Sequence, residues 1–135
     1  MSRQFHQVQN FNGDVLEIPM RPVGMQSQDE FDLSMRQLQE EQNEIMQAYA
    51  ADDFIGVLDG LFDLQYFLFG IFYKNGINAE TYEKIFTVIH NCNMTKVKGI
   101  KAGREGFDAA DAVKPESWVS PEEQISKILE VGDAT

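Results

Sequence analysis

The sequence is short of several residue types, and each shortage excludes a kind of protein. Cysteine occurs once, at Cys92, so the chain cannot close an internal disulfide and suits a reducing, cytoplasmic location. The two histidines, His6 and His90, have no partner nearby at the spacing of a metal site. No G-x-x-x-x-G-K-[ST] segment is present, which excludes a Walker-type phosphate loop.

Basic residues and long apolar runs are also scarce. The chain has only 11 Lys and Arg residues but 22 Asp and Glu residues, which gives a net charge of −11. Surfaces that bind nucleic acids or anionic membranes need basic stripes, so we expect neither partner. The longest apolar run, residues 64–73, is about half the length that a membrane span needs. No secretory signal is visible, and we expect a soluble intracellular protein.

Helical signals fill the rest of the chain and predict an all-α fold, a bundle of four to five helices. The length of 135 residues and the 43% hydrophobic content fit one domain over residues 1–135 with a real core. Ser27 and Glu30 form a capping-box pattern at the start of a helix. Asp52 or Asp53 can cap the next helix, which ends near Lys74 before Asn75-Gly76.

The ends of the chain are predicted with less regular structure. Residues 1–26 read as an N-terminal arm with one short helix, packed on the bundle or on a neighbouring subunit. Asn78 can cap a third helix, and residues 97–119 read as a basic, glycine-rich loop. Ser120 and Pro121 then open a C-terminal helix over residues 120–132.

Two acidic clusters stand out, and helical geometry brings each onto one face. Glu40, Glu41 and Glu44 fall within an arc of roughly 100°, and Asp59 and Asp63 lie one turn apart. Two antiparallel helices would place all five carboxylates face to face, where a close pair repels by about 4 kcal/mol. A divalent cation with oxygen ligands would offset that repulsion, and Mg²⁺ is the commonest such ion, with Mn²⁺ as the alternative.

A metal site competes here with simpler explanations. The first cluster alone would be an ordinary solvated helix face. The second lies in the nearly apolar stretch from Phe54 to Tyr73, and a helix that is apolar all round is buried, in a core or a subunit interface. Buried carboxylates are rare unless they are paired or bind metal. Together the clusters favour a metal site over structural pairing.

A local concentration of basic residues indicates an anionic ligand. Lys96, Lys98, Lys101 and Arg104 fall within nine positions of an otherwise acidic chain. Triphosphate oxygens accept charge-assisted hydrogen bonds from such side chains. The alternative is a solvated loop attracted to the acidic body of the protein.

The arrangement of these motifs resembles the MazG-like all-α NTP pyrophosphatases. The resemblance rests on Glu40-Glu41-x-x-Glu44, on the acidic element that ends at Asp63, and on two later stretches, residues 90–96 (HNCNMTK) and 114–118 (KPESW). The later stretches are similar to the branch with dUTP-hydrolysing members. The family's second motif is Glu-x-x-Asp, whereas this chain has Gly60 in the Glu position and an acid one residue earlier, at Asp59.

The resemblance implies a Mg²⁺-dependent nucleoside triphosphate pyrophosphohydrolase that releases a monophosphate and pyrophosphate. A homo-oligomer, dimer or tetramer, is expected because the second helix has more apolar surface than one small bundle covers. Two alternatives stay open: a non-catalytic nucleotide-binding or helical interaction module, which Gly60 favours, and a phosphoribosyl-ATP pyrophosphohydrolase. The implied roles are metal binding for Glu41, Glu44, Asp59 and Asp63, water activation for Glu40, and substrate binding for Asn93, Lys96, Lys98, Lys101 and Arg104.

Overall fold

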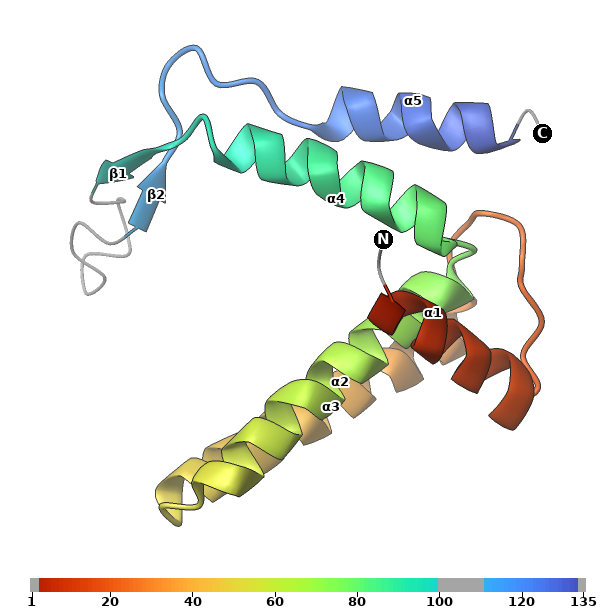
Figure 1. The fold of residues 1–135 in the computed structure, drawn as a ribbon, viewed down its shortest axis with the longest axis vertical. Helices are drawn as coiled ribbons and strands as arrows, with labels where there is room; N and C mark the ends of the chain where they lie inside the picture. Colours follow the sequence, from red (N-terminus) through yellow and green to blue (C-terminus); the bar gives the residue numbers. More distant parts are fainter. Residues whose placement is uncertain (1–2, 100–110, 134–135) are drawn as a thin grey trace. The chain divides into compact units, whose positions relative to one another are not determined.

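The computed structural model describes residues 3–99 and 111–133, which belong to two compact units (Figure 1). The first unit is Met1–Ala79 and the second is Glu80–Thr135. Both units are mainly helical, so the predicted all-α fold is confirmed. The expected single domain over residues 1–135 stays a prediction.

The described residues of the first unit form four helical segments, and those of the second unit form two helices and a small hairpin. The first unit contains α1 (Arg3–Asn10), a short π-helical segment η1 (Phe11–Val15), α2 (Gln28–Ala50) and α3 (Phe54–Lys74). Helix α4 (Ala79–Asn93) leads into the second unit, where β1 (Val97–Gly99), β2 (Asp111–Val113) and α5 (Glu122–Asp133) follow.

The helix boundaries in the first unit are set by the capping residues that the sequence indicated. The Ser27 hydroxyl accepts a hydrogen bond from the backbone N–H of Glu30 at 3.3 Å. The Asp53 carboxylate accepts one from the N–H of Gly56 at 2.9 Å, which selects Asp53 over Asp52 as the cap of α3. Gly76, with φ +80°, supplies the left-handed residue after α3. These caps fix the lengths of α2 and α3.

Helices α2 and α3 form an antiparallel hairpin that is the largest packed element of the first unit (Figure 1). Only three residues, 51–53, separate them, and so short a connection makes neighbouring helices antiparallel. Asp52 has φ +55° in this connection, a left-handed conformation that lets the chain reverse. The two acidic clusters therefore lie on neighbouring helices.

The N-terminal arm packs on the C-terminal half of α3. The Phe5 ring lies 5.4 Å from that of Phe69, and Phe11 meets Tyr66 edge to face at the same centroid distance. The Tyr73 hydroxyl donates a hydrogen bond to the carbonyl of Ile18 at 2.6 Å. The buried hydrophobic side chains of the described residues are Phe5 and Val8 of α1, Phe69 and Tyr73 of α3, and Ile77 and Ala79.

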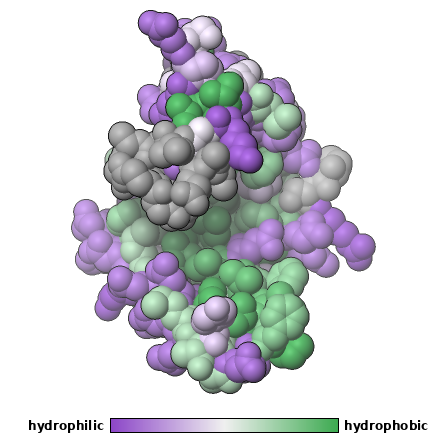
Figure 2. Space-filling view, turned by 90° about the vertical axis from the view of Figure 1, so that its left-hand side faces the viewer, coloured by the Kyte–Doolittle hydropathy of each residue, from purple (hydrophilic) through white to green (hydrophobic). Residues whose placement is uncertain are grey.

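Much of the apolar surface of α3 is uncovered in the single chain, and its burial in a core or a subunit interface stays a prediction. Phe54, Ile55, Leu61 and Phe62 are exposed, because α3 packs mainly on α2 and, near its end, on α1. Apolar surface is visible over the lower part of the molecule in Figure 2. By length and composition alone α3 could cross a membrane, although the sequence had indicated no run of sufficient length.

The predicted loop over residues 97–119 contains regular structure. Strands β1 and β2 pair antiparallel, with Val97 opposite Val113 and Gly99 opposite Asp111. Val97 and Val113 are β-branched residues that favour strands. Strands of three residues are too short to be predicted from an alternation of apolar and polar residues.

Candidate active site

Helix α2 carries three glutamates of the first acidic cluster, in different environments. Glu40 and Glu44 are exposed, whereas Glu41 is half-buried. Glu41 and Glu44 are three residues apart and therefore lie on the same side of the helix. We call Glu41 and Glu44 the α2 acids.

Helix α3 carries Asp59 and Asp63, which we call the α3 acids. They are one turn apart; Asp59 is exposed and Asp63 is half-buried. The sequence placed both on a helix buried in a core or a subunit interface; in the single chain, α2 and α1 leave much of α3 uncovered.

Glu41 shows that the two pairs of acids lie within electrostatic range of each other. Its pKa is raised from the ordinary value of 4.5, first by burial of the carboxyl group. The negative charges of Glu44 and Asp63, a side-chain hydrogen bond with Glu44 and the negative charge of Asp59 raise that pKa further, in this order. The predicted convergence of acids from both helices is thus reflected at one carboxyl group.

One oxygen of this carboxyl group lacks a partner. Oε2 of Glu41 is buried and accepts no hydrogen bond, a costly state for a polar atom. A cation placed between the four acids would supply the missing partner and offset their repulsion. Within residues 3–99 and 111–133, however, no group of three or more His, Cys, Asp or Glu side chains is arranged to hold a metal ion. The acids fit a divalent cation by chemistry, and the metal site stays a prediction.

The basic residues predicted to bind phosphate belong to the second unit. Asn93 ends α4 and is exposed, Lys96 is half-buried, and Lys98 is exposed on β1. Lys101 and Arg104 lie outside the described residues.

Lys96 shares an aromatic ring with a lysine that the sequence had not assigned to substrate binding. Its Nζ lies 5.4 Å from the centre of the Trp118 ring, and the Nζ of Lys114 lies 4.7 Å from the same centre. The pairing of Val97 with Val113 explains this proximity, because positions 96 and 114 come next in the antiparallel register. Recognising the two strands in the sequence would have indicated Lys114.

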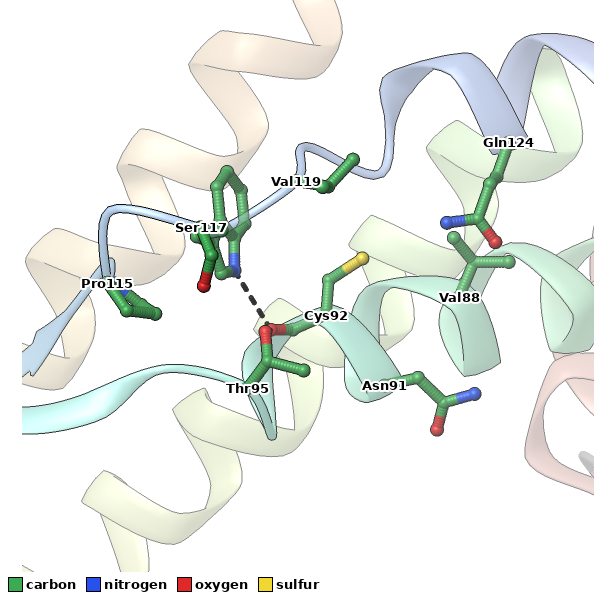
Figure 3. A pocket seen from close by; sticks show the side chains of 9 residues that line it. Val88, Asn91, Cys92, Thr95, Pro115, Ser117, Val119 and Gln124 are labelled. Carbon is green, nitrogen blue, oxygen red and sulfur yellow. Dashed lines mark hydrogen bonds between the residues drawn. The ribbon is translucent and has the colours of Figure 1, made fainter.

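Trp118 is held in place beside a pocket of about 380 Å³ (Figure 3). Its Nε1 donates a hydrogen bond to the carbonyl of Cys92 at 3.0 Å. The pocket is lined from α4, the turn between α4 and β1, the segment between β2 and α5, and α5, with Asn91, Thr95 and Ser117 among its polar side chains. Its volume is in the range of small-molecule sites.

A family model described as phosphoribosyl-ATP pyrophosphohydrolase matches residues 8–93, and the chain belongs to this family, a member of the MazG-like all-α NTP pyrophosphatase superfamily. It is a pyrophosphohydrolase, a hydrolase acting on acid anhydrides. No curated protein matches the chain.

The raised pKa of Glu41 predicts that Glu41→Gln stabilises the metal-free protein but reduces the stabilisation that Mg²⁺ provides. Folding favours the protonated carboxyl group, so this stabilisation is lost as pH rises from 4.5 through the raised pKa. Glu41→Gln mimics the protonated form. Without metal at neutral pH it should raise the free energy of unfolding by up to about 1 kcal/mol, the scale of partly exposed charge interactions.

The same variant should respond less to Mg²⁺ than the wild type, because it lacks one charge of the metal site. Thermal unfolding with and without millimolar Mg²⁺, at neutral pH and below pH 4.5, measures both effects. A Glu41→Gln protein that is less stable than wild type in the metal-free state would contradict the claim that the ionised Glu41 carboxylate destabilises the folded protein.

Proposed function

We propose that the protein is a Mg²⁺-dependent nucleoside triphosphate pyrophosphohydrolase that converts a (d)NTP and water into a (d)NMP and pyrophosphate. The main support is Glu41, whose buried and unpartnered oxygen lies within range of three further acids in a chain that belongs to a pyrophosphohydrolase family. Such an activity would serve house-cleaning of the nucleotide pool. The free thiol of Cys92 suits a cytoplasmic location.

The α2 acids and the α3 acids would together hold the metal. Carboxylate oxygens are the ligands that Mg²⁺ and Mn²⁺ prefer. When bound, the ion would draw charge from the phosphate oxygens and lower the pKa of a coordinated water. The negative charges of the acids make the electrostatic potential at this position negative in the metal-free protein, and a negative potential attracts a cation.

Glu40 would act on the attacking water. It lies next to Glu41 on α2, and its side chain is exposed. An ionised carboxylate can orient a water and accept its proton. The water oxygen would bond to the α-phosphorus, the bond from that phosphorus to the α,β-bridging oxygen would break, and pyrophosphate would leave with the bond's electrons.

Lys96 and Lys114 would bind phosphate oxygens. In the described part of the chain neither lysine has an acidic partner, and both stand over the ring of Trp118. Phosphate would offer these ammonium groups charge-assisted hydrogen bonds. We propose supporting contacts from Asn93, Lys98, Lys101 and Arg104.

The family match favours a second substrate, phosphoribosyl-ATP. It contains the same anhydride between α- and β-phosphates, so the roles above apply unchanged. A pyrophosphate-release screen over canonical and modified nucleotides and phosphoribosyl-ATP, with and without Mg²⁺, separates the candidates. Release from phosphoribosyl-ATP alone would select the second substrate, and nucleotide binding with no release from any of them would indicate a non-catalytic module.

Glu44→Gln tests the metal site directly. The variant keeps the size of the side chain and removes one charge of the α2 acids, so it should weaken Mg²⁺ binding and abolish turnover without unfolding the protein. Calorimetric titration measures the affinity, and circular dichroism checks the fold. Unchanged Mg²⁺ affinity would refute the role of Glu44.

Lys96→Ala tests phosphate binding. Loss of one charge-assisted hydrogen bond costs about 1.5–3 kcal/mol, so kcat/KM should fall about ten- to hundredfold. Mg²⁺ affinity without nucleotide should be largely kept. Lys84→Ala is the matched control, because Lys84 forms an exposed ion pair with Glu80 at 3.2 Å. A Lys96→Ala enzyme within twofold of wild type would reject the phosphate contact.

The exposed apolar surface of the hairpin supports assembly with a second copy of the chain. Phe54, Ile55 and Phe62 are more than two-thirds exposed on α3, and Met46 and Tyr49 are exposed on α2. Insertion of α3 into a bilayer would place Asp63 near its centre, at a cost of about 2.5–3.5 kcal/mol. Two hairpins packed together would instead form a four-helix bundle, which covers apolar faces.

We therefore expect a dimer or tetramer in solution. Light scattering at micromolar concentration should give at least twice the chain mass of 15.4 kDa, without detergent. Phe62→Glu should shift the population towards monomer, because it places a charge on the proposed contact surface. A wild-type protein that is monomeric under these conditions would exclude the assembly.

A further inference from the structure

Gly60 occupies a position in α3 where glycine needs a structural reason. It is buried in the interior of the helix, directly after Asp59 and three residues before Asp63. Glycine inside a helix is about 1 kcal/mol less favourable than alanine, because it loses more backbone freedom on folding. A packing constraint that excludes a side chain at this position would account for it.

The constraint is the approach of Ile45 from α2. A Cβ atom at position 60 would lie 2.5 Å from Cγ1 of Ile45, far inside van der Waals contact. The same Cβ would lie 3.7 Å from the Cα of Ile45, so the backbone of α2 is itself close. Cγ1 is bonded to the Cβ of Ile45 and has little freedom to move aside. The absence of a side chain at Gly60 therefore permits the observed distance between the helices.

This close approach lies beside the proposed metal ligands. Ile45 directly follows Glu44, and Gly60 directly follows Asp59, so each partner of the contact adjoins one acid. The separation of the helices at this point therefore governs the separation of the α2 acids from the α3 acids. Mg²⁺ needs oxygens at about 2.0–2.1 Å in near-octahedral geometry, and a shift of a few tenths of an ångström matters to it.

We propose that Gly60 is a positioning residue, which sets the distance between α2 and α3 so that the acids of both helices can serve one metal site. This inference rests on the proposed Mg²⁺ site. Any side chain at position 60 would push α2 and α3 apart at the acids, while the helices themselves would persist.

Gly60→Ala in the full chain is the decisive variant. Alanine favours the helix, so helical content should be kept, whereas the clash with Ile45 should weaken Mg²⁺ binding about tenfold, equal to 1.4 kcal/mol. Titration calorimetry without nucleotide measures the affinity. In turnover assays, the Mg²⁺ concentration for half-maximal rate should rise, while the nucleotide KM at saturating Mg²⁺ should stay unchanged.

Gly70→Ala is the matched control on the same helix. Gly70 is also buried, but the nearest atom to its added Cβ would be Nδ2 of Asn12 at 3.4 Å, an ordinary contact with the end of a side chain. Its Mg²⁺ affinity should equal that of the wild type. Ile45→Ala in the Gly60→Ala background removes the clashing Cγ1 and should restore the affinity to that of Ile45→Ala alone.

The outcomes separate the positioning role from the metal site itself. A wild-type protein without Mg²⁺ binding would overturn both. Equal affinities of wild type, Gly60→Ala and Gly70→Ala would overturn the positioning role and leave the metal site standing. A folded double variant that is not rescued would also overturn it. If the double variant does not fold, the contrast between Gly60→Ala and Gly70→Ala decides.

Discussion

The approach of α2 to α3 is the contact on which the rest of the first unit depends. This contact brings negatively charged carboxylates close together, and their mutual repulsion opposes the packing of the two helices. Gly60 and Ile45 allow the helices to meet closely, and the arm packs its aromatic rings on the far half of α3. The acids are thus held near one another by apolar packing, which is how a protein keeps a charged site ready for a ligand.

Capping residues made much of the helical architecture predictable from the sequence. Ser27, Asp53 and Gly76 act through local hydrogen bonds and backbone conformation, which depend on neighbouring residues alone. The strands β1 and β2 were missed because they are short and pair across the intervening residues. With them the nearness of Lys114 to Lys96 was missed, since it follows from register and not from spacing.

The helices that carry the acids were predicted from the sequence, whereas the exposure of their side chains in the single chain was not. Periodicity placed the acids on facing surfaces, and the pKa of Glu41 reflects their proximity. Burial depends on what covers a helix, and a sequence pattern does not specify this: α3 reads as a core helix and yet exposes Phe54 and Phe62. The second motif of the family that the chain resembles has Glu at the position of Gly60. A Glu there would begin with the Cβ atom that Ile45 excludes, which explains in packing terms why the acid stands at Asp59.

Trp118 gives the second unit an optical property. It is the only tryptophan of the chain, and its indole is fixed by the carbonyl of Cys92 with two ammonium groups above the ring. The fluorescence emission of an indole responds to charge near the ring, and all tryptophan fluorescence of this protein comes from the ring beside Lys96 and Lys114. The protein therefore carries an intrinsic fluorescent reporter of its basic cluster, whereas the acids of α2 and α3 have no such reporter.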